Sequence, residues 1–329
     1  MQAYRSIDIA LPNFGEGRCS QVCVIPIMII SASRRTDIPA FYAEWFINRV
    51  RAGYCEVPNP FNRKQISRVS LRPEDVDVIV FWTRHPRPLF PYLDELEQRG
   101  FRYYFHYTLT NYPRELVPRT PAYHTAVDTF RSLAARIGAE RVIWRYDPIV
   151  FSKRTGAGFH AENYAQIAAD LQGYTTRSVV SIMDWYPKLR HRLDALQGTG
   201  FKPLEVGSPS GERFATLMSG LAALAAENGM QIQSCAEPLD LSGYGILPGK
   251  CVDDAYIRSV FGIEVNPRKD PGQRAACGCV ISRDIGVYNT CSFGCQYCYA
   301  TQNFDRARER IKFHDPLADA MLIDDVLVV

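Results

Sequence analysis

The chain has 329 residues, of which 47% are hydrophobic, and its 38 basic and 35 acidic side chains give a formal net charge of +3. This is the composition of an ordinary folded protein, and the length excludes a small fold that depends on metal for its core. The chain shows no run of 18 apolar residues and no secretory signal, so we expect a cytoplasmic protein without a membrane partner, whose ten cysteines are metal ligands or free thiols rather than disulfides.

Strand-like and helix-like segments alternate from Ile25 onward. Seven short apolar runs are predicted to be strands: Ile25–Ser31, Asp77–Thr83, Phe101–Leu109, Arg141–Tyr146, Ser178–Met183, Gln231–Cys235 and Val280–Val287. Seven helices are predicted beside them: Phe41–Arg51, Pro88–Gln98, Ala122–Ile137, Ala161–Leu171, Pro187–Leu196, Gly211–Asn228 and Thr301–Lys312. The run Asn59–Asn62, before the second strand, is predicted to be a turn. The alternation favours an α/β fold with a parallel sheet, a TIM-like (β/α) barrel or partial barrel with its chemistry at the carboxyl ends of the strands.

The chain divides by composition into four predicted parts. The first residues lack periodicity, which makes Met28 an alternative start, and Cys19 and Cys23 within them are assigned no metal. A later segment is rich in Gly, Pro, Asp and Lys and is predicted to be irregular. The divisions are an extension (1–27), a barrel core (28–238), an irregular cysteine-bearing insertion (239–279) and a last βα unit with the cysteine loop (280–329).

Polar residues follow the predicted strands, and polar groups that converge at one rim of a barrel make a binding cavity. Arginine presents a fork suited to carboxylates and phosphates. The residues expected to be catalytic are Arg34, Arg35, Asp37, Arg145 and Asp147, and Ser31 and Thr83 are expected to bind a cofactor. Each of these roles has a structural alternative. Arg145 and Asp147 could form a structural ion pair, and Asp37 could be only the N-cap of the helix that follows it.

Near the end of the sequence, Cys291, Cys295 and Cys298 form a Cys-x3-Cys-x2-Cys run. Three thiolates this close can hold a [4Fe–4S] cluster by three of its irons and leave the fourth iron open to a cofactor or substrate. Zinc is the alternative, because any four of the five cysteines between 277 and 298 could make a tetrahedral thiolate site. Zinc motifs usually show two close pairs of cysteines, so the triplet favours iron–sulfur.

Four further cysteines remain once the triplet has its cluster: Cys235, Cys251, Cys277 and Cys279. The first ends a predicted strand, the second lies in the insertion, and the last two directly precede the final predicted strand. Clusters are commonly held by four thiolates, so a second [4Fe–4S] cluster is one interpretation. Zinc ligation and free or buried thiols are the others.

The triplet and the aromatic Tyr297 before its last cysteine resemble the cluster signature of the radical S-adenosylmethionine (radical SAM) superfamily. The resemblance implies that the open iron binds S-adenosylmethionine, whose one-electron cleavage gives a 5′-deoxyadenosyl radical that acts on an unknown small molecule or nucleic acid. It also implies an electron donor such as ferredoxin or flavodoxin, and it places Tyr297 near the adenine. Gly294 is expected to let the short loop wrap the cluster.

Alternative functions are an iron–sulfur redox or sensor protein without radical chemistry and a zinc-dependent barrel hydrolase. The sequence also departs from the radical SAM pattern: the cysteine loop follows the last predicted strand instead of the first, and a Gly-Gly-Glu segment of the superfamily is missing. The resemblance therefore implies a permuted barrel, in which the last strand takes the place of the first.

From about Met28 to Pro316 the chain also resembles a bacterial family of unknown function. The matching segments are Ile29–Pro39, Phe81–Thr83, Arg145–Pro148 and Asp284–Ala300. A more local resemblance, carried by Arg145–Pro148 and Cys298-Tyr299-Ala300, is to spore photoproduct lyase and related repair enzymes of the radical SAM superfamily. That second resemblance makes nucleic acid a candidate substrate.

Overall fold

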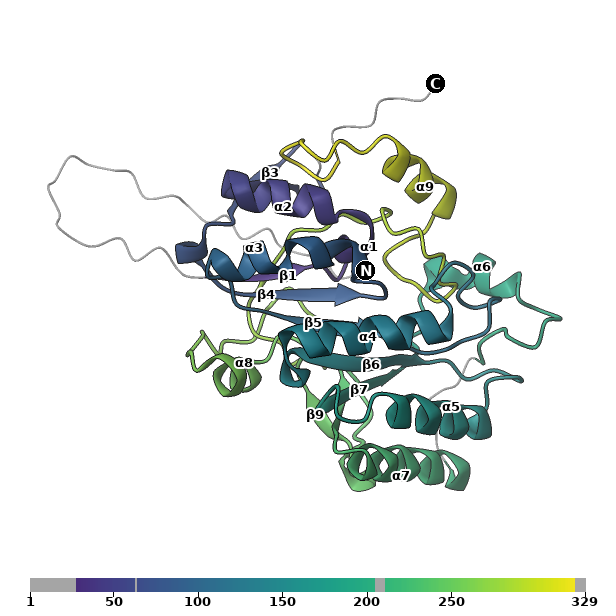
Figure 1. Cartoon of the computed structure of the whole chain (residues 1–329). Coiled ribbons are helices and arrows are strands. Elements are labelled where there is room, and N and C mark those ends of the chain that lie inside the picture. Colours follow the sequence, from purple (N-terminus) through teal and green to yellow (C-terminus); the bar gives the residue numbers. More distant parts are fainter. Residues whose placement is uncertain (1–27, 63, 205–210, 323–329) are drawn as a thin grey trace, which may run out of the picture.

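A computed structural model describes residues 28–62, 64–204 and 211–322 (Figure 1), so Cys19 and Cys23 lie outside the described residues. Eight strands form one sheet in the order β10-β1-β4-β5-β6-β7-β8-β9. Every neighbouring pair in this sheet is parallel, which confirms the predicted α/β class. The strands are β1 (Met28–Ala32), β4 (Val76–Thr83), β5 (Tyr103–Thr108), β6 (Val142–Ile149), β7 (Arg177–Ile182), β8 (Gln231–Cys235), β9 (Leu247–Gly249) and β10 (Arg283–Asp284).

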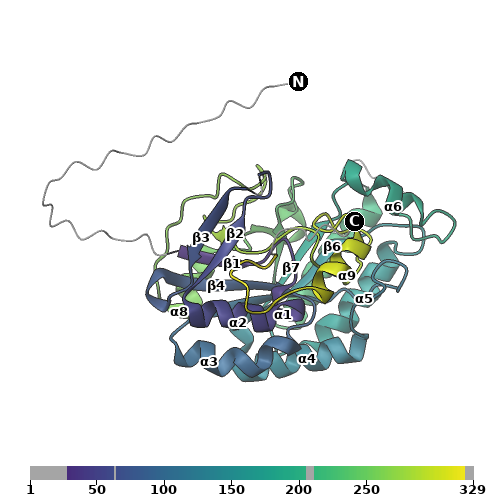
Figure 2. The same ribbon diagram turned by 90° about the horizontal axis from the view of Figure 1, so that it is seen from above.

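Helices α2 to α5 and α7 lie along one side of this sheet (Figures 1 and 2). The helices are α1 (Ile38–Phe41), α2 (Ala43–Ala52), α3 (Leu93–Gln98), α4 (Tyr123–Ile137), α5 (Ala157–Asp170), α6 (Arg190–Asp194), α7 (Glu212–Glu227), α8 (Asp254–Phe261) and α9 (Phe304–Lys312). Asp37 is the N-cap of α1, because its carboxylate accepts a hydrogen bond from the backbone N–H of Ala40 at 3.0 Å. The capping alternative for Asp37 is therefore confirmed.

The structure adds elements that the sequence patterns do not predict. Strands β2 (Tyr54–Pro58) and β3 (Ile66–Ser70) form an antiparallel hairpin, and the predicted turn Asn59–Asn62 lies between them. The segment 239–279 is not wholly irregular, since it supplies the edge strand β9 and the helix α8. The helix has 8 residues, too few to show clear periodicity, and its start is fixed by the side chain of Asp253, which accepts from two backbone N–H groups. The last predicted strand, Val280–Val287, shortens to the two residues of β10.

Alternate residues of each strand face two different cores. One core lies between the sheet and the helices and includes Ile79, Phe81, Phe105 and Trp144. The other lies on the opposite face and includes Ile29, Val78, Val80, Tyr104, Ile143 and Val179. The segment 251–280 fills this second face, since Val252, Tyr256, Ile257, Val265 and Val280 pack into the same core. We call this second face the interior.

The interior becomes polar toward the carboxyl ends of the strands. Two residues beyond Val80, Tyr104 and Ile143 on the same strands lie Trp82, His106 and Arg145. The strand alternation that buries the apolar side chains therefore also delivers polar side chains to one end of the interior. This end is called the mouth below. Strands β9 and β10 are the two edges of the sheet, and no pairing between them is found in the described part of the chain.

The edge strand β10 comes after every other described strand in the sequence but lies beside the first one. Asp284 of β10 holds this edge in place: its carboxylate accepts hydrogen bonds from the hydroxyls of Ser31 at 2.6 Å and Ser33 at 2.7 Å. The backbone N–H groups of Arg34 and Gly286 also donate to it, at 2.8 and 3.0 Å. A Cβ atom at residue 286 would lie 2.0 Å from the Ser33 hydroxyl oxygen, so the close approach requires glycine.

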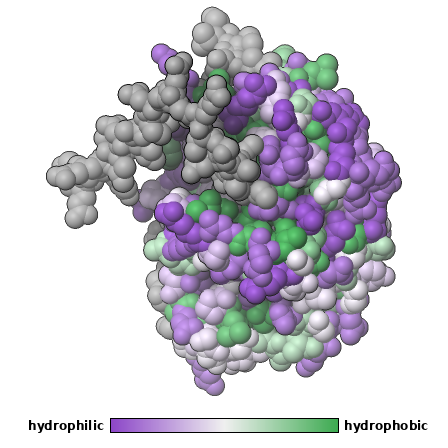
Figure 3. Space-filling view, turned by 90° about the vertical axis from the view of Figure 1, so that its left-hand side faces the viewer, coloured by the Kyte–Doolittle hydropathy of each residue, from purple (hydrophilic) through white to green (hydrophobic). Residues whose placement is uncertain are grey.

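Figure 3 shows the side of the molecule that lies on the left in Figure 1. Hydrophilic residues (purple) and hydrophobic residues (green) are interspersed over its described surface. None of the helices in the described ranges is long and apolar enough to cross a membrane. The candidate functional site is therefore sought at the mouth, where polar side chains from several strand ends meet.

Candidate functional site

The strand ends that meet at the mouth are joined by hydrogen bonds between neighbouring strands. The backbone N–H of Arg84, after β4, donates to the Asp37 carboxylate at 2.7 Å. The hydroxyl of Ser181 on β7 donates to Asp147 on β6, and the backbone N–H of Ile182 donates to Glu237 at 3.0 Å. The convergence of strand-end residues predicted from the sequence is therefore present for these groups.

The cysteine triplet lies on a closed loop that we call the three-thiol loop, residues 289–300. Its ends are joined by the backbone N–H of Asn289, which donates to the carbonyl of Ala300 at 3.0 Å. Gly294, at the tip, has a φ of 77°, the left-handed conformation that glycine adopts without strain. Cys295 is buried and packs with Phe293, Tyr297 and Tyr112 in an apolar cluster that Cys291 and Cys298 also contact. The triplet is thus carried on a short, enclosed loop, as its spacing predicts.

Two arginines that the sequence analysis did not select hold the three-thiol loop. Arg192 of α6 donates to the carbonyl oxygens of Gln296, Cys298 and Thr301 at 2.7, 2.6 and 2.7 Å. Arg84 donates from Nη2 to the Tyr297 hydroxyl at 2.7 Å. Burial alone would lower the pKa of the Arg84 guanidinium, but Tyr297 and the three thiols raise it above its ordinary value. Both positive charges therefore lie where thiolates would need them.

The thiols of Cys291 and Cys295 are protonated in their present surroundings. Burial raises the pKa of Cys295, and that of Cys291 well above its ordinary value, because a thiolate is poorly solvated there. Burial also raises the pKa of Asp37, which faces Cys291, to about 6. A metal or cluster that binds here must displace the thiol protons and supply compensating positive charge. Three thiols, an apolar shell and two guanidinium groups are a donor set that fits an iron–sulfur cluster.

The structure brings the other four cysteines together, and we call them the four-thiol group: Cys235, Cys251, Cys277 and Cys279. The sulfurs of Cys235 and Cys251 are 2.8 Å apart. Cys279 accepts from the backbone N–H groups of Cys251 and Val252 at 3.3 and 3.4 Å. Hydrogen bonds from the thiols of Cys251 and Cys277 lower the pKa of Cys279 well below its ordinary value. Spacing alone did not establish this meeting of three distant segments.

Two of the residues predicted to be catalytic face the four-thiol group. Arg145 donates from Nη1 to the sulfur of Cys251 at 2.8 Å and forms an ion pair with Asp147 at 2.5 Å, so the ion-pair alternative is confirmed. Arg34 lies over the Trp82 ring at 4.7 Å. Burial would lower the pKa of Arg34, but Cys279 and Asp284 raise it above its ordinary value. These arginines therefore surround the four-thiol group in the interior.

His106 completes the interior layer. Its ring is stacked on Trp82 at 5.3 Å, and its Nε2 is 2.8 Å from the carbonyl oxygen of Cys251. Burial lowers the pKa of His106 well below its ordinary value, so the ring is neutral. Its Nδ1 and the Nη2 of Arg34 are buried without a hydrogen-bond partner. The Nε2 faces a carbonyl oxygen and must carry the proton of the neutral ring, so the orphaned Nδ1 is an acceptor and the orphaned Nη2 of Arg34 is a donor. Buried polar atoms without partners are costly, and these two mark a place where a ligand or ion would find partners.

Three other predicted site residues, Ser31, Arg35 and Thr83, bind neighbouring side chains or backbone groups of the fold. Ser31 donates to Asp284, and Arg35 forms an ion pair with the same carboxylate at 3.8 Å and donates to the Gly286 carbonyl at 3.3 Å. The hydroxyl of Thr83 accepts from the backbone N–H of His85 at 2.9 Å. Asp284 was within a matching segment but was not selected, and Arg192 lies on a charged helix that offers no sequence signal. Cys55, outside both groups, is buried and free.

Within the described ranges, no three histidine, cysteine, aspartate or glutamate side chains are already arranged around a common point as a metal site. The sulfurs of the four-thiol group instead form a row of pairwise contacts. Either cysteine group would therefore adjust its side chains on binding a metal.

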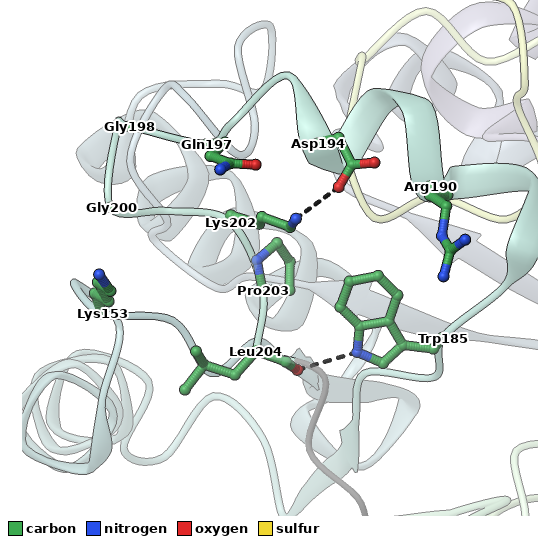
Figure 4. A pocket seen from close by; sticks show the side chains of 10 residues that line it. All are labelled: Lys153, Trp185, Arg190, Asp194, Gln197, Gly198, Gly200, Lys202, Pro203 and Leu204. Atoms are coloured by element: carbon green, nitrogen blue, oxygen red, sulfur yellow. Dashed lines mark hydrogen bonds and ion pairs between the residues drawn. The ribbon is translucent and has the colours of Figure 1, made fainter.

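A cavity lies beside the site rather than in it. It has a volume of about 680 Å³ and is lined by Lys153, Trp185, Arg190, Asp194, Gln197, Gly198, Gly200, Lys202, Pro203 and Leu204 (Figure 4). None of these is a cysteine, although α6 borders the cavity and also carries Arg192. A smaller cavity of about 200 Å³ is lined by Arg84, Thr110 and Tyr112, among others. The smaller cavity adjoins the three-thiol loop through Arg84.

The model of one protein family, described as a domain of unknown function (DUF1848), matches residues 29–300. No curated protein matches the chain. Among solved structures the chain is similar to the dihydropyrimidinase from Brevibacillus agri NCHU1002, with 9% sequence identity and a TM-score of 0.28, over 64% of this chain and 41% of that one. This chain thus spans less than half of that enzyme, and a likeness so weak supports no conclusion.

Proposed function

Because the chain belongs to the DUF1848 family, which brings no reaction with it, the chemistry has to come from its own residues, and we propose a radical SAM enzyme. The observation that carries the proposal is the three-thiol loop. It presents Cys291, Cys295 and Cys298 on one closed loop beside two half-buried guanidinium groups. Three thiolates hold a [4Fe–4S] cluster by three irons and leave one iron free for a small-molecule ligand.

Each residue of the loop has a defined task in this proposal. Cys291, Cys295 and Cys298 would hold the cluster, which when bound supplies one electron to S-adenosylmethionine and splits it into methionine and a 5′-deoxyadenosyl radical. Arg84 and Arg192 offset the charge of the thiolates. Tyr297 stays protonated, because burial raises its pKa, and its hydroxyl keeps Arg84 beside the sulfurs. A reduced ferredoxin or flavodoxin would donate the electron.

The position of the loop in the sheet supports the permuted arrangement. Because β10 pairs with β1, the loop emerges at the carboxyl edge of the sheet next to the end of β1. A loop that followed an additional first strand would emerge at the same place. The smaller cavity beside Arg84 offers space for a ligand, and Asp147, Ser181 and Glu237 farther along the mouth are the groups that we assign to an unknown substrate.

The test is to purify the full chain without oxygen, determine iron and sulfide, and record the electron paramagnetic resonance of the reduced protein with and without S-adenosylmethionine. We expect about four irons held by the three-thiol loop, a signal that shifts on adding S-adenosylmethionine, and release of 5′-deoxyadenosine with dithionite. Cys298→Ala should lose the iron and the release together. The matched control is Cys55→Ala, which removes a buried free thiol that contacts neither cysteine group.

A fully loaded protein whose signal ignores S-adenosylmethionine and which releases no 5′-deoxyadenosine would overturn the radical proposal. That result would leave an iron–sulfur redox or sensor protein. Zinc in place of iron at the three-thiol loop would overturn the iron–sulfur assignment as well.

A further inference from the structure

The four-thiol group is built differently from the three-thiol loop, and it does not depend on the function proposed for that loop. Cys235 is the last residue of β8, and Cys251 is the second residue after β9. Cys277 and Cys279 lie in the segment before β10. We infer that Cys235, Cys251, Cys277 and Cys279 form a closed site for a single tetrahedral ion of the zinc class.

The first argument is the compactness of the group. The sulfurs of Cys235 and Cys251 are 2.8 Å apart, and all four cysteines are free thiols. Zinc–sulfur bonds of about 2.3 Å in a tetrahedron place the sulfurs about 3.8 Å apart. A shift of about 1 Å between two side chains would make room for one ion. A cubane cluster is larger and would have to push the sulfurs much farther apart.

The second argument is the packing around the sulfurs. Cys251, Cys277 and Cys279 are 4%, 6% and 2% exposed, so little solvent reaches them. The surrounding interior is filled by Val252, Val280 and the Trp82–His106 stack. Structural zinc sites are closed in this way, with four protein ligands and no open position. The enclosure leaves room for an ion more readily than for a cluster.

The third argument is the set of donors aimed at the sulfurs. Two backbone N–H groups donate to Cys279, and the guanidinium of Arg145 donates to Cys251. A zinc ion with four thiolates carries a net charge of −2, which two adjacent guanidinium groups, Arg34 and Arg145, would balance. The unpartnered Nη2 of Arg34 is buried beside this group and would gain a thiolate acceptor.

The bound ion would have a structural task. It would fasten β8, β9 and the segment before β10 to one another in the interior, on the side where the edge strands β9 and β10 do not pair with each other in the described residues. The segment 251–280, which fills the interior, would then be fixed near both of its ends, at Cys251 and at Cys277 and Cys279.

The experiment measures zinc and iron per chain in the full-length protein, produced with both metals supplied and purified without oxygen. We expect about one zinc per chain, in keeping with a four-thiolate site. Cys251→Ala and Cys277→Ala should each lower the zinc at least tenfold and leave the iron of the three-thiol loop in place. Cys291→Ala should do the reverse, and Cys55→Ala should change neither metal. This crossed design separates failure of the zinc site from failure of the proposed function.

A second measurement uses the unmutated chain, in case the variants do not fold. Cobalt supplied in place of zinc should give intense thiolate-to-cobalt charge-transfer absorption and the visible bands of tetrahedral cobalt. About eight irons and eight sulfides per chain, of which about four of each remain in Cys291→Ala, would mean that the four-thiol group holds a second cluster. That result would overturn the single-ion site. Four thiols that bind no metal and react as freely as other thiols, or that pair as disulfides, would overturn it too.

Discussion

The two cysteine groups of this protein show how a local and a non-local site differ. The three thiols of the loop come from one run of the sequence, and their surroundings are arginines from other elements that bind the loop's carbonyls and tyrosine. The four-thiol group exists only when three distant segments meet in the interior. The first arrangement leaves a site at the mouth, whereas the second encloses one. This difference is in keeping with the two proposals, a reactive centre at the loop and a structural tie at the four-thiol group.

The largest effect is expected from Arg145→Met, which acts on the enclosed group. The substitution leaves the half-buried Asp147 without its ion-pair partner and removes the buried donor to Cys251, so we expect the free energy of unfolding to fall by about 3–5 kcal/mol. Urea unfolding without oxygen measures this loss. The double variant Arg145→Met/Asp147→Asn should recover part of it, and iron at the three-thiol loop should be retained. Equal stability of wild type and single variant would contradict the comparison.

The second effect separates acid sensitivity of the fold from acid loss of metal. Burial lowers the pKa of His160, which bonds to Tyr146 and Val150 and belongs to neither cysteine group, from 6.5 to about 4. Above pH 6.5 the His160 ring is neutral in both the folded and the unfolded state. As the pH falls toward 4 only the unfolded state gains the proton, so stability falls by about 3 kcal/mol. His160→Gln should flatten this part of the pH profile in urea unfolding, and an unchanged slope would contradict it.

A third effect tests how the three-thiol loop is anchored. Asp284→Asn replaces one carboxylate oxygen by an amide that cannot accept, so two of the four donors lose their acceptor. We expect a loss of about 1.5–3 kcal/mol and faster release of iron from the neighbouring loop, with zinc unchanged. Iron release after mixing with a chelator gives the rate. Parallel loss of zinc and iron would show that the two groups are not independent.

The smallest effect concerns the aromatic residue inside the loop. Tyr297→Phe keeps the ring packed against Tyr112 but removes the acceptor of Arg84, at a cost of about 1–2 kcal/mol. Iron content should stay near that of wild type, because no ligand is lost. The shift of the electron paramagnetic resonance signal with S-adenosylmethionine should persist at a weaker apparent affinity. A complete loss of iron would mean that Tyr297 holds the loop itself.

The sequence predicted the parallel sheet because buried strands read as apolar runs separated by helices. It did not reveal β9, which has 3 residues and no apolar pattern, and it predicted β10 too long, since only 2 residues of Val280–Val287 form the strand. The triplet was evident from spacing, whereas the meeting of Cys235 with Cys251 depends on the pairing of β8 with β9. Arg192 and Asp284 were missed since their partners are backbone groups and hydroxyls distant in sequence. Long-range hydrogen bonds of this kind leave no local signal.

The pairing of β10 with β1 has a consequence for how the protein is made. The ribosome completes all the other described strands before it reaches β10, and the three-thiol loop comes later still. Until then the backbone groups at the outer edge of β1 are unpaired. The hydroxyls of Ser31 and Ser33 also lack their acceptor, the carboxylate of Asp284. The three thiols of the loop are therefore among the last described residues to be made, and a chain that stalls before β10 contains none of them.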